Sequence, residues 1–146
     1  MNYNDIEILF AEDSEDDAFF TMRALVKSGL SNKVLHVRDG EEALDFIYCR
    51  GIYSGRNFQM HPRLILLDLK MPKVSGIEVL VKIKSDPDIR SIPVVMLTAS
   101  KEDPDIRKCY ALGVNSYIVK PVESDNFFQA IKELGMYWML LSNPNR

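Results

Sequence analysis

At four places the sequence puts a polar residue directly after a short aliphatic run. These polar residues are Glu12 with Asp13, Asp68, Thr98 and Lys120. The runs before them are Ile8–Ala11, Leu64–Leu67, Val94–Leu97 and Tyr117–Val119. Short, wholly apolar runs are typical of buried parallel strands, whose carboxyl ends lie at one edge of a sheet. The pattern therefore predicts acids, a hydroxyl and an amine at one edge, a set that could hold a divalent metal and accept a phosphoryl group.

Each member of this set has a distinct chemical use. Like charges crowded at Glu12 and Asp13 need a cation, and hard carboxylate oxygens facing solvent suit Mg²⁺ or Mn²⁺. A carboxylate facing such a metal, here Asp68, can be a nucleophile toward phosphorus and form an aspartyl phosphate. The metal, the Lys120 amine and the Thr98 hydroxyl would then contact the phosphoryl oxygens. The acids at 15–17 have a simpler explanation, because carboxylates are favoured at a helix N-terminus.

Strand-like and helix-like segments alternate five times along the chain. The predicted strands are Ile6–Phe10, Val34–Val37, Leu64–Leu67, Val94–Leu97 and Ser116–Val119. Such alternation implies right-handed crossovers and a parallel sheet covered by helices on both faces. We therefore predict an α/β fold with a doubly wound, flavodoxin-like five-stranded parallel sheet of order 2-1-3-4-5 and five helices.

Apolar spacings of three and four predict the buried face of each helix. The predicted buried positions are Ala18, Met22, Leu25, Val26 and Gly29, then Ile77, Leu80 and Val81, then Ile106, Cys109, Tyr110 and Gly113. Helix-start signals support these assignments. Ser14 with Asp17 fits a capping box, Ser124 is a candidate cap for the last helix, and Pro104 suits a first helical turn.

Two segments exceed the needs of a minimal fold. Residues 50–63 form a connection longer than the ~2–6 residues usual in α/β units. The last helix is predicted to extend through Gly135, with a heptad-like apolar seam. The seam consists of Phe127, Ile131, Leu134, Trp138 and Leu141. Its terminal turns are expected to project past the sheet, where an apolar seam needs a partner.

Length and composition predict one cytoplasmic domain. The 146 residues fit a single domain over 1–146, with 142–146 as a polar tail. A net charge of −3 and the absence of a recognition helix predict no nucleic-acid surface. Cys49 and Cys109 match no metal or redox spacing and are predicted to be buried thiols within helices. No secretory signal or bilayer-spanning stretch is visible, so no membrane contact is expected.

Taken together, the motifs resemble the receiver domain of two-component response regulators. The resemblance covers essentially the whole chain. It rests on Glu12-Asp13, Leu66–Gly76, Met96–Ala99 and Tyr117–Pro121. The sequence departs slightly from the commonest pattern: Glu12 replaces a frequent Asp, and Ser75 stands before Gly76 where Asp is usual. The first change should preserve metal binding, and the second should alter a helix cap.

The resemblance implies a role for each site residue. Asp68 would be the phosphoacceptor. Asp13, Asp68 and the backbone carbonyl of Lys70 would bind Mg²⁺ directly, and Glu12 would act largely through water. The resemblance thus assigns the metal site to two short segments, 12–13 and 68–70, that are far apart in the sequence.

The resemblance also implies a switch. Thr98 and Lys120 would contact the phosphoryl oxygens, and the Lys120–Pro121 peptide bond would be cis. Phosphorylation would draw Thr98 inward and vacate space for the switch aromatic Tyr117. The surface of the fourth helix, fifth strand and fifth helix would change.

A finer resemblance is to the single-domain regulators associated with bacterial phytochrome histidine kinases. It rests on Arg50–Tyr53, His61–Asp68, Ser85–Arg90 and Leu134–Trp138. The implied partners are a sensor histidine kinase, phytochromes being one kind, and a second copy of the chain. The homodimer would form through the last helix and C-terminal extension.

Two other functions stay open at this point. An aspartate-nucleophile phosphatase for small esters would need a second acid just after Asp68, where Lys70 stands instead. A constitutive protein-interaction module with an idle phosphosite is the other alternative. The leading hypothesis is a phosphoacceptor switch with self-catalysed phosphorylation and dephosphorylation only.

Overall fold

The fold is a five-stranded parallel sheet of order β2-β1-β3-β4-β5 in the computed structural model, which describes residues 2–30 and 33–135. The strands are β1 (Ile8–Ala11), β2 (Val34–Val37), β3 (Leu64–Asp68), β4 (Val94–Thr98) and β5 (Ser116–Val119). Neighbouring strands pair in parallel throughout. The predicted flavodoxin-like topology is confirmed, and each predicted strand is present with ends shifted by at most two residues.

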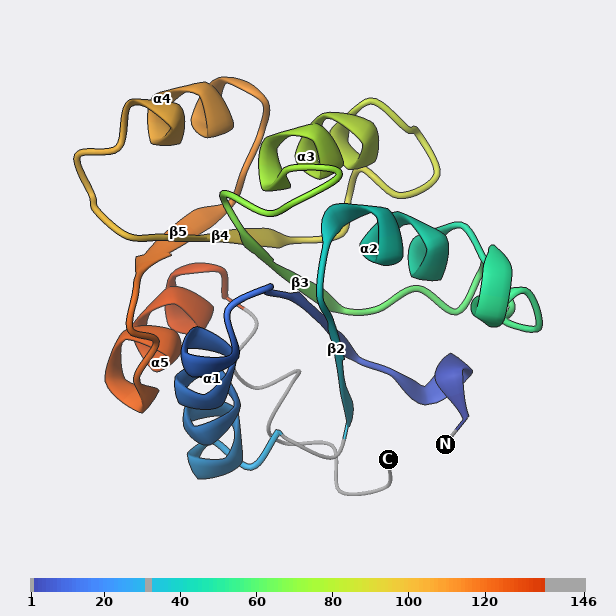
Figure 1. The fold of residues 1–146 in the computed structure, drawn as a ribbon, viewed down its shortest axis with the longest axis horizontal. Coiled ribbons are helices and arrows are strands. Elements are labelled where there is room, and N and C mark those ends of the chain that lie inside the picture. Colours follow the sequence, from blue (N-terminus) through green and yellow to red (C-terminus); the bar gives the residue numbers. More distant parts are fainter. Residues whose placement is uncertain (1, 31–32, 136–146) are drawn as a thin grey trace.

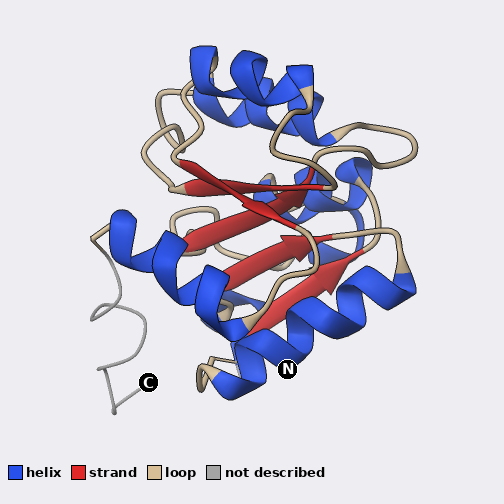
Figure 2. Cartoon of the chain, turned by 90° about the vertical axis from the view of Figure 1, so that its left-hand side faces the viewer, coloured by secondary structure: helices blue, strands red, loops and turns tan. Residues whose placement is uncertain are grey.

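Five helices cover the two faces of this sheet. They are α1 (Glu15–Lys27), α2 (Gly40–Ile47), α3 (Gly76–Lys84), α4 (Pro104–Ala111) and α5 (Ser124–Glu133). The helices α1 and α5 lie on one face, whereas α2, α3 and α4 lie on the other (Figure 1). A second view shows the sheet between the two helical layers (Figure 2). The arrangement is doubly wound, as predicted.

Two hydrophobic clusters, one on each face, hold the layers together. Alternate residues of β3 point to opposite sides: Leu67 joins the cluster under α2, α3 and α4, and Leu66 joins the cluster under α1 and α5. All five residues of β3 are buried. A strand covered on both faces needs apolar side chains in both directions, which explains why these runs do not alternate with polar residues.

Parallel register brings the ends of the strands together. Ala11 pairs with Leu67, Asp68 pairs with Leu97, and Thr98 pairs with Val119. The residues that end or follow these four strands therefore lie along the same edge of the sheet, as the sequence predicted.

Some of the predicted helix faces are wrong. Val26 and Val81 are 59% and 43% exposed, and Tyr110 is 49% exposed. The positions that α1 and α3 bury instead are Thr21, Ala24, Val79 and Ile83. The prediction chose the buried positions by their apolar side chains. A helix on a twisted sheet instead buries whatever side chains face the strands, including a threonine.

Of the three predicted helix starts, one is confirmed, one is confirmed in part and one is wrong. The Ser14 side chain accepts a hydrogen bond from the Asp17 backbone N–H at the start of α1, but the Ser14 N–H donates to Glu12, so the predicted capping box with Asp17 is incomplete. Pro104 occupies the first turn of α4. The predicted cap Ser124 is wrong, because Glu123 caps α5 and Ser124 is its first helical residue.

The two cysteines differ in their surroundings. Cys109 is buried in α4, as predicted. Cys49 lies beyond the end of α2, is partly exposed and has a φ of 57°. The prediction that Cys49 is buried within a helix is therefore wrong, because α2 ends at Ile47.

The long connection over 50–63 packs against α2. The Tyr53 side chain is buried, and its hydroxyl donates a hydrogen bond to Glu42 at 3.0 Å. The Arg56 guanidinium lies 3.9 Å from the centre of the Phe46 ring and donates hydrogen bonds to the Phe46 and Met60 carbonyls. These contacts hold the extra residues along α2, from Glu42 in its first turn to Phe46 near its end.

The last described helix ends before the predicted extension. α5 finishes at Glu133, and Gly135 has a φ of 69°. Phe127 and Ile131 are buried and Leu134 packs against the same cluster, so the first half of the seam is core. Trp138 and Leu141, with the rest of the predicted C-terminal extension, lie outside the described residues.

Candidate functional site

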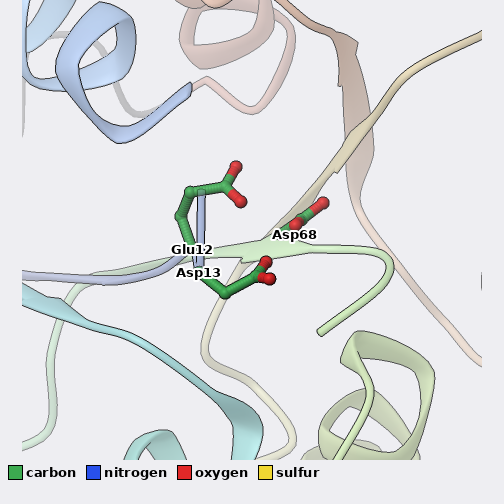
Figure 3. A group of neighbouring side chains, drawn as sticks. All are labelled: Glu12, Asp13 and Asp68. Carbon is green, nitrogen blue, oxygen red and sulfur yellow. The ribbon is translucent and has the colours of Figure 1, made fainter. Parts of the chain in front are cut away.

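Three carboxylates converge at the carboxyl edge of the sheet. Glu12 and Asp13 follow β1, and Asp68 ends β3. Each acid offers one ligand atom, and these three atoms all lie within 4.8 Å of one another. Figure 3 shows the three side chains around a common space. Glu12 and Asp68 are buried, whereas Asp13 is exposed. The three groups that sequence spacing assigned to a metal site are thus brought together.

The Lys120 ammonium neutralises part of this charge. Its Nζ donates hydrogen bonds to Asp17 Oδ2 at 2.8 Å, to Asp68 Oδ1 at 3.1 Å and to Glu12 Oε1 at 3.3 Å. The Lys120 side chain is 14% exposed. An ammonium has three donors, and here a carboxylate accepts from each. Lys120 therefore connects the end of β5 to β1, β3 and the first turn of α1.

Charge and burial shift the pKa values of two of these groups. Burial, a hydrogen bond with Asp68 and the charge of Asp68 raise the pKa of Glu12 to about 8, against the partial opposition of Lys120. Burial alone would lower the pKa of Lys120, but the Asp17 hydrogen bond and the charge and hydrogen bond of Asp68 raise it above its ordinary value. The site therefore favours the protonated form of both groups: burial is the main cause at Glu12, and the neighbouring carboxylates are the cause at Lys120.

The backbone around Glu12 is held from two sides. The Glu12 carbonyl lies 2.8 Å from His36 Nε2 on β2, and Glu12 Oε2 accepts a hydrogen bond from the Ser14 N–H. The first contact is a hydrogen bond when Nε2 carries the proton. Both contacts orient the acidic segment before α1 begins.

The Thr98 hydroxyl is buried at the end of β4 and directed at the loop that follows. It donates a hydrogen bond to the Ser100 carbonyl at 3.1 Å. In the described structure it is thus engaged away from the carboxylates, although its backbone is one residue beyond the Leu97 that pairs with Asp68.

Tyr117 lies on β5 beside α4. Its ring meets the Tyr110 ring edge-on, with 6.2 Å between centroids. Both rings line a hollow whose wall includes Pro104 and Ile106 of α4. Tyr117 is only partly buried.

The loop after Asp68 is shaped by close backbone contacts. A Cβ added at Gly76 would overlap with the Asp68 carbonyl, so only glycine fits there. Ser75 caps α3 through a complete capping box with Glu78, so a serine fulfils this role where the family usually has Asp. The Lys70 ammonium lies 3.7 Å from Asp103, the cap of α4. The Lys120–Pro121 peptide bond is cis, as the resemblance implied.

Asp17 is the site residue that sequence analysis missed. Its position in the first turn of a helix gave a sufficient explanation for an acid. The available signal was its spacing, because four residues after Asp13 and one helical turn after the Ser14 cap place it above the strand ends. Its contact with Lys120 is the shortest of the three.

The donor set fits a divalent cation. The site offers carboxylate oxygens from three acids, two of which are buried. Carboxylate oxygens are the ligands that Mg²⁺ and Mn²⁺ prefer. Three carboxylates converge here, and the Lys120 ammonium contacts two of them, Glu12 and Asp68. The residues present therefore suit a small, doubly charged ion.

The fold and this acidic edge define a class of protein. The family model of the response regulator receiver domain matches residues 8–132, so the chain belongs to this family of phosphoacceptor switches in two-component signalling. Within residues 2–30 and 33–135, no helix has the length and apolar character needed to cross a bilayer.

Several individual response regulators are similar to this chain in sequence or in structure. The chain is 39% identical to the probable methanogenesis regulatory protein FilR2 of Methanothrix harundinacea, over 90% of this chain and 83% of the relative. It is 36% identical to the response regulator Rcp1 of Synechocystis, over 90% of this chain and 88% of Rcp1. The bacteriophytochrome response regulator RtBRR is 50% identical, with a TM-score of 0.85 over 94% of this chain and 82% of that one. The predicted likeness to phytochrome-associated regulators is confirmed.

One of these relatives bears on the metal. A solved structure of Rcp1 is its Mn²⁺-bound form, with a TM-score of 0.72 over 93% of this chain and 94% of that one. The predicted use of Mg²⁺ or Mn²⁺ at an acidic group is confirmed for the family.

Proposed function

We propose that this protein is a single-domain response regulator whose Asp68 accepts a phosphoryl group from the phosphohistidine of a sensor histidine kinase. One observation carries the proposal. Asp68 lies at the end of a central strand, with Glu12 and Asp13 beside it and the Lys120 ammonium 3.1 Å away. This is a nucleophile surrounded by the groups that phosphoryl transfer needs.

The chain's own residues have distinct tasks in this transfer. An Asp68 carboxylate oxygen attacks phosphorus, and the bond from phosphorus to the donor nitrogen breaks with its electron pair on nitrogen. Lys120 moves onto a phosphoryl oxygen from its present contact with Asp68. Asp13, Asp68, the Lys70 carbonyl and, through water, Glu12 would hold Mg²⁺ or Mn²⁺. When bound, the cation neutralises charge that develops on the transferred oxygens.

The same residues support a switch. The Thr98 hydroxyl exchanges the Ser100 carbonyl for a phosphoryl oxygen, which is a charged and therefore stronger acceptor. Movement of Thr98 makes room for Tyr117, and the ring leaves its edge-on contact with Tyr110. The surface formed by α4, β5 and α5 then changes shape.

The proposal includes the partners and the setting. Similarity to RtBRR supports a histidine kinase of the phytochrome type, and the C-terminal apolar seam supports a homodimer through the last helix and C-terminal extension. Residues 1–146 form a single receiver domain in this proposal, and the protein acts in the cytoplasm, where sensor kinases present phosphohistidine.

Mass spectrometry after incubation with acetyl phosphate and MgCl₂ tests the proposal. The wild type should gain one phosphoryl group, and Asp68→Asn should gain none. Asp105→Asn, which removes a carboxylate from the first turn of α4, is the control and should react as the wild type does. An unmodified wild type would contradict the proposal. Release of phosphate from simple esters over many turnovers would favour the phosphatase alternative.

A further inference from the structure

Asp17 differs from the other two partners of the Lys120 ammonium. Glu12 and Asp68 belong to the group of acids that could hold a metal, and Asp17 does not. Asp17 projects from α1, whereas the other two lie at strand ends. Its Oδ2 nevertheless makes the shortest contact with Nζ, at 2.8 Å against 3.1 Å and 3.3 Å. The ammonium is thus held most closely by an acid outside the metal set.

This difference matters once the site is in use. In the proposed function a bound cation engages Asp68 directly and Glu12 through water, and the phosphoryl group becomes attached to Asp68, so these two carboxylates change partners during the reaction. Asp17 lies outside this exchange, so its carboxylate can keep the hydrogen bond from the Lys120 ammonium. We propose that Asp17 is a positioning residue, which holds the Lys120 ammonium in place for phosphoryl transfer to Asp68; the inference rests on the proposed function.

The physical reason lies in the lysine side chain. Lysine carries its charge on a flexible four-carbon stem, so holding it at one point costs conformational entropy. A charge-assisted hydrogen bond to a carboxylate on a helix offsets part of this cost before the donor arrives. The Asp17 side chain is 33% exposed, so the contact is partly shielded from water and its effect should be measurable without unfolding the protein.

The covalent step with acetyl phosphate is balanced. A bond forms between an Asp68 oxygen and phosphorus, the bond from phosphorus to the acetyl oxygen breaks, and acetate leaves with the electron pair. Lys120 gives up no proton. It stabilises negative charge on the phosphoryl oxygens, and Asp17 acts only through Lys120.

The test compares Asp17→Asn with Asp16→Asn. Both variants remove one negative charge from the first turn of α1, but Asp16 is exposed and the described Lys120 contacts do not include it. We expect Asp17→Asn to lower the rate of phosphorylation by acetyl phosphate and Mg²⁺ about three- to tenfold, the range of a charged hydrogen bond in part exposed to water. Asp16→Asn should stay within about twofold of the wild type. Asp17→Glu, which restores the charge, should recover much of the lost rate.

A second measurement needs no phosphoryl donor. Without Asp17 the ammonium rests only on Glu12 and Asp68, which a cation also needs. Titration followed by the electron paramagnetic resonance signal of free Mn²⁺ should therefore show about threefold weaker binding in Asp17→Asn than in Asp16→Asn. Urea unfolding of both variants checks that they fold alike.

The outcomes separate the two proposals. A wild type that gains no phosphoryl group overturns the proposed function and this inference with it. A reactive wild type with equal rates and equal Mn²⁺ affinities in Asp17→Asn and Asp16→Asn overturns only the role of Asp17. Failure of Asp17→Glu to exceed the rate of Asp17→Asn also counts against it.

Discussion

Replacement of Glu12 by glutamine should stabilise the metal-free protein at alkaline pH. The pKa of this carboxyl rises from 4.5 to about 8 on folding. The native state therefore holds a proton that the unfolded state releases, and the free energy of unfolding falls as pH rises from 4.5 to 8. At 1.36 kcal/mol per pKa unit, the penalty reaches at most about 5 kcal/mol above pH 8. Glutamine is neutral at every pH, so the Glu12→Gln variant does not incur this penalty.

Removal of this charge leaves no stranded partner. Lys120 keeps its hydrogen bonds with Asp17 and Asp68 when the Glu12 carboxylate is lost. A glutamine oxygen can still accept the hydrogen bond from the Ser14 N–H. The usual cost of breaking a buried ion pair, about 3–5 kcal/mol, therefore does not apply in full.

Urea unfolding in EDTA at pH 5 and pH 9 measures the effect. Glu12→Gln should match the wild type at pH 5 and exceed it by about 2–5 kcal/mol at pH 9. Glu15→Gln is the matched control, because the Glu15 side chain is 82% exposed and should show no such dependence. An equal difference between Glu12→Gln and the wild type at both pH values would refute the reasoning, since the carboxyl would not titrate between them. Added Mg²⁺ should reduce the advantage of the variant at pH 9.

Three further predictions concern other parts of the site. Gly76→Ala should lower the free energy of unfolding, measured by urea unfolding, by about 1–3 kcal/mol, because the alanine Cβ would overlap with the Asp68 carbonyl. Gly55→Ala is the control and should not change this free energy, because the space around Gly55 is open. Thr98→Ala should still be phosphorylated in the mass assay, but tryptic cleavage and amide hydrogen exchange of α4 should not respond to the phosphoryl group. A chain that ends before Tyr137 should lose self-association in sedimentation experiments and retain phosphorylation; unchanged sedimentation would exclude the tail as the dimer contact.

The sequence predicts the site well because strand ends are determined locally. A run such as Leu64–Leu67 is buried on both sides, and an ionisable residue at its end must lie where the chain leaves the core. Parallel topology then aligns these ends without any information about side-chain contacts. Asp68, Thr98 and Lys120 could therefore be placed at one edge from position alone.

Helix faces and Asp17 could not be predicted in the same way. Which side of α1 is buried depends on how the helix crosses the sheet, so the apolar Val26 is exposed and the polar Thr21 is buried. Asp17 has a local explanation as a helix N-terminal acid, and its contact with Lys120 joins residues 103 positions apart. The packing of 50–63 against α2 likewise depends on the Arg56 and Tyr53 contacts, which no periodicity encodes.

In the proposed function, the balance of charge at the site would link cation binding to phosphorylation. Glu12, Asp17 and Asp68 contact one ammonium, and Asp13 lies beside Glu12 and Asp68. The fully ionised set therefore has an excess of negative charge that one lysine does not remove. A phosphoryl group on Asp68 increases this excess, because it carries close to two negative charges near neutral pH. A divalent cation opposes that increase, whereas a proton on Glu12 neutralises only one charge. We therefore expect the acids that destabilise the metal-free state to make the proposed phosphoryl transfer dependent on the cation. Mutations that relieve the repulsion should stabilise the fold while they impair the reaction.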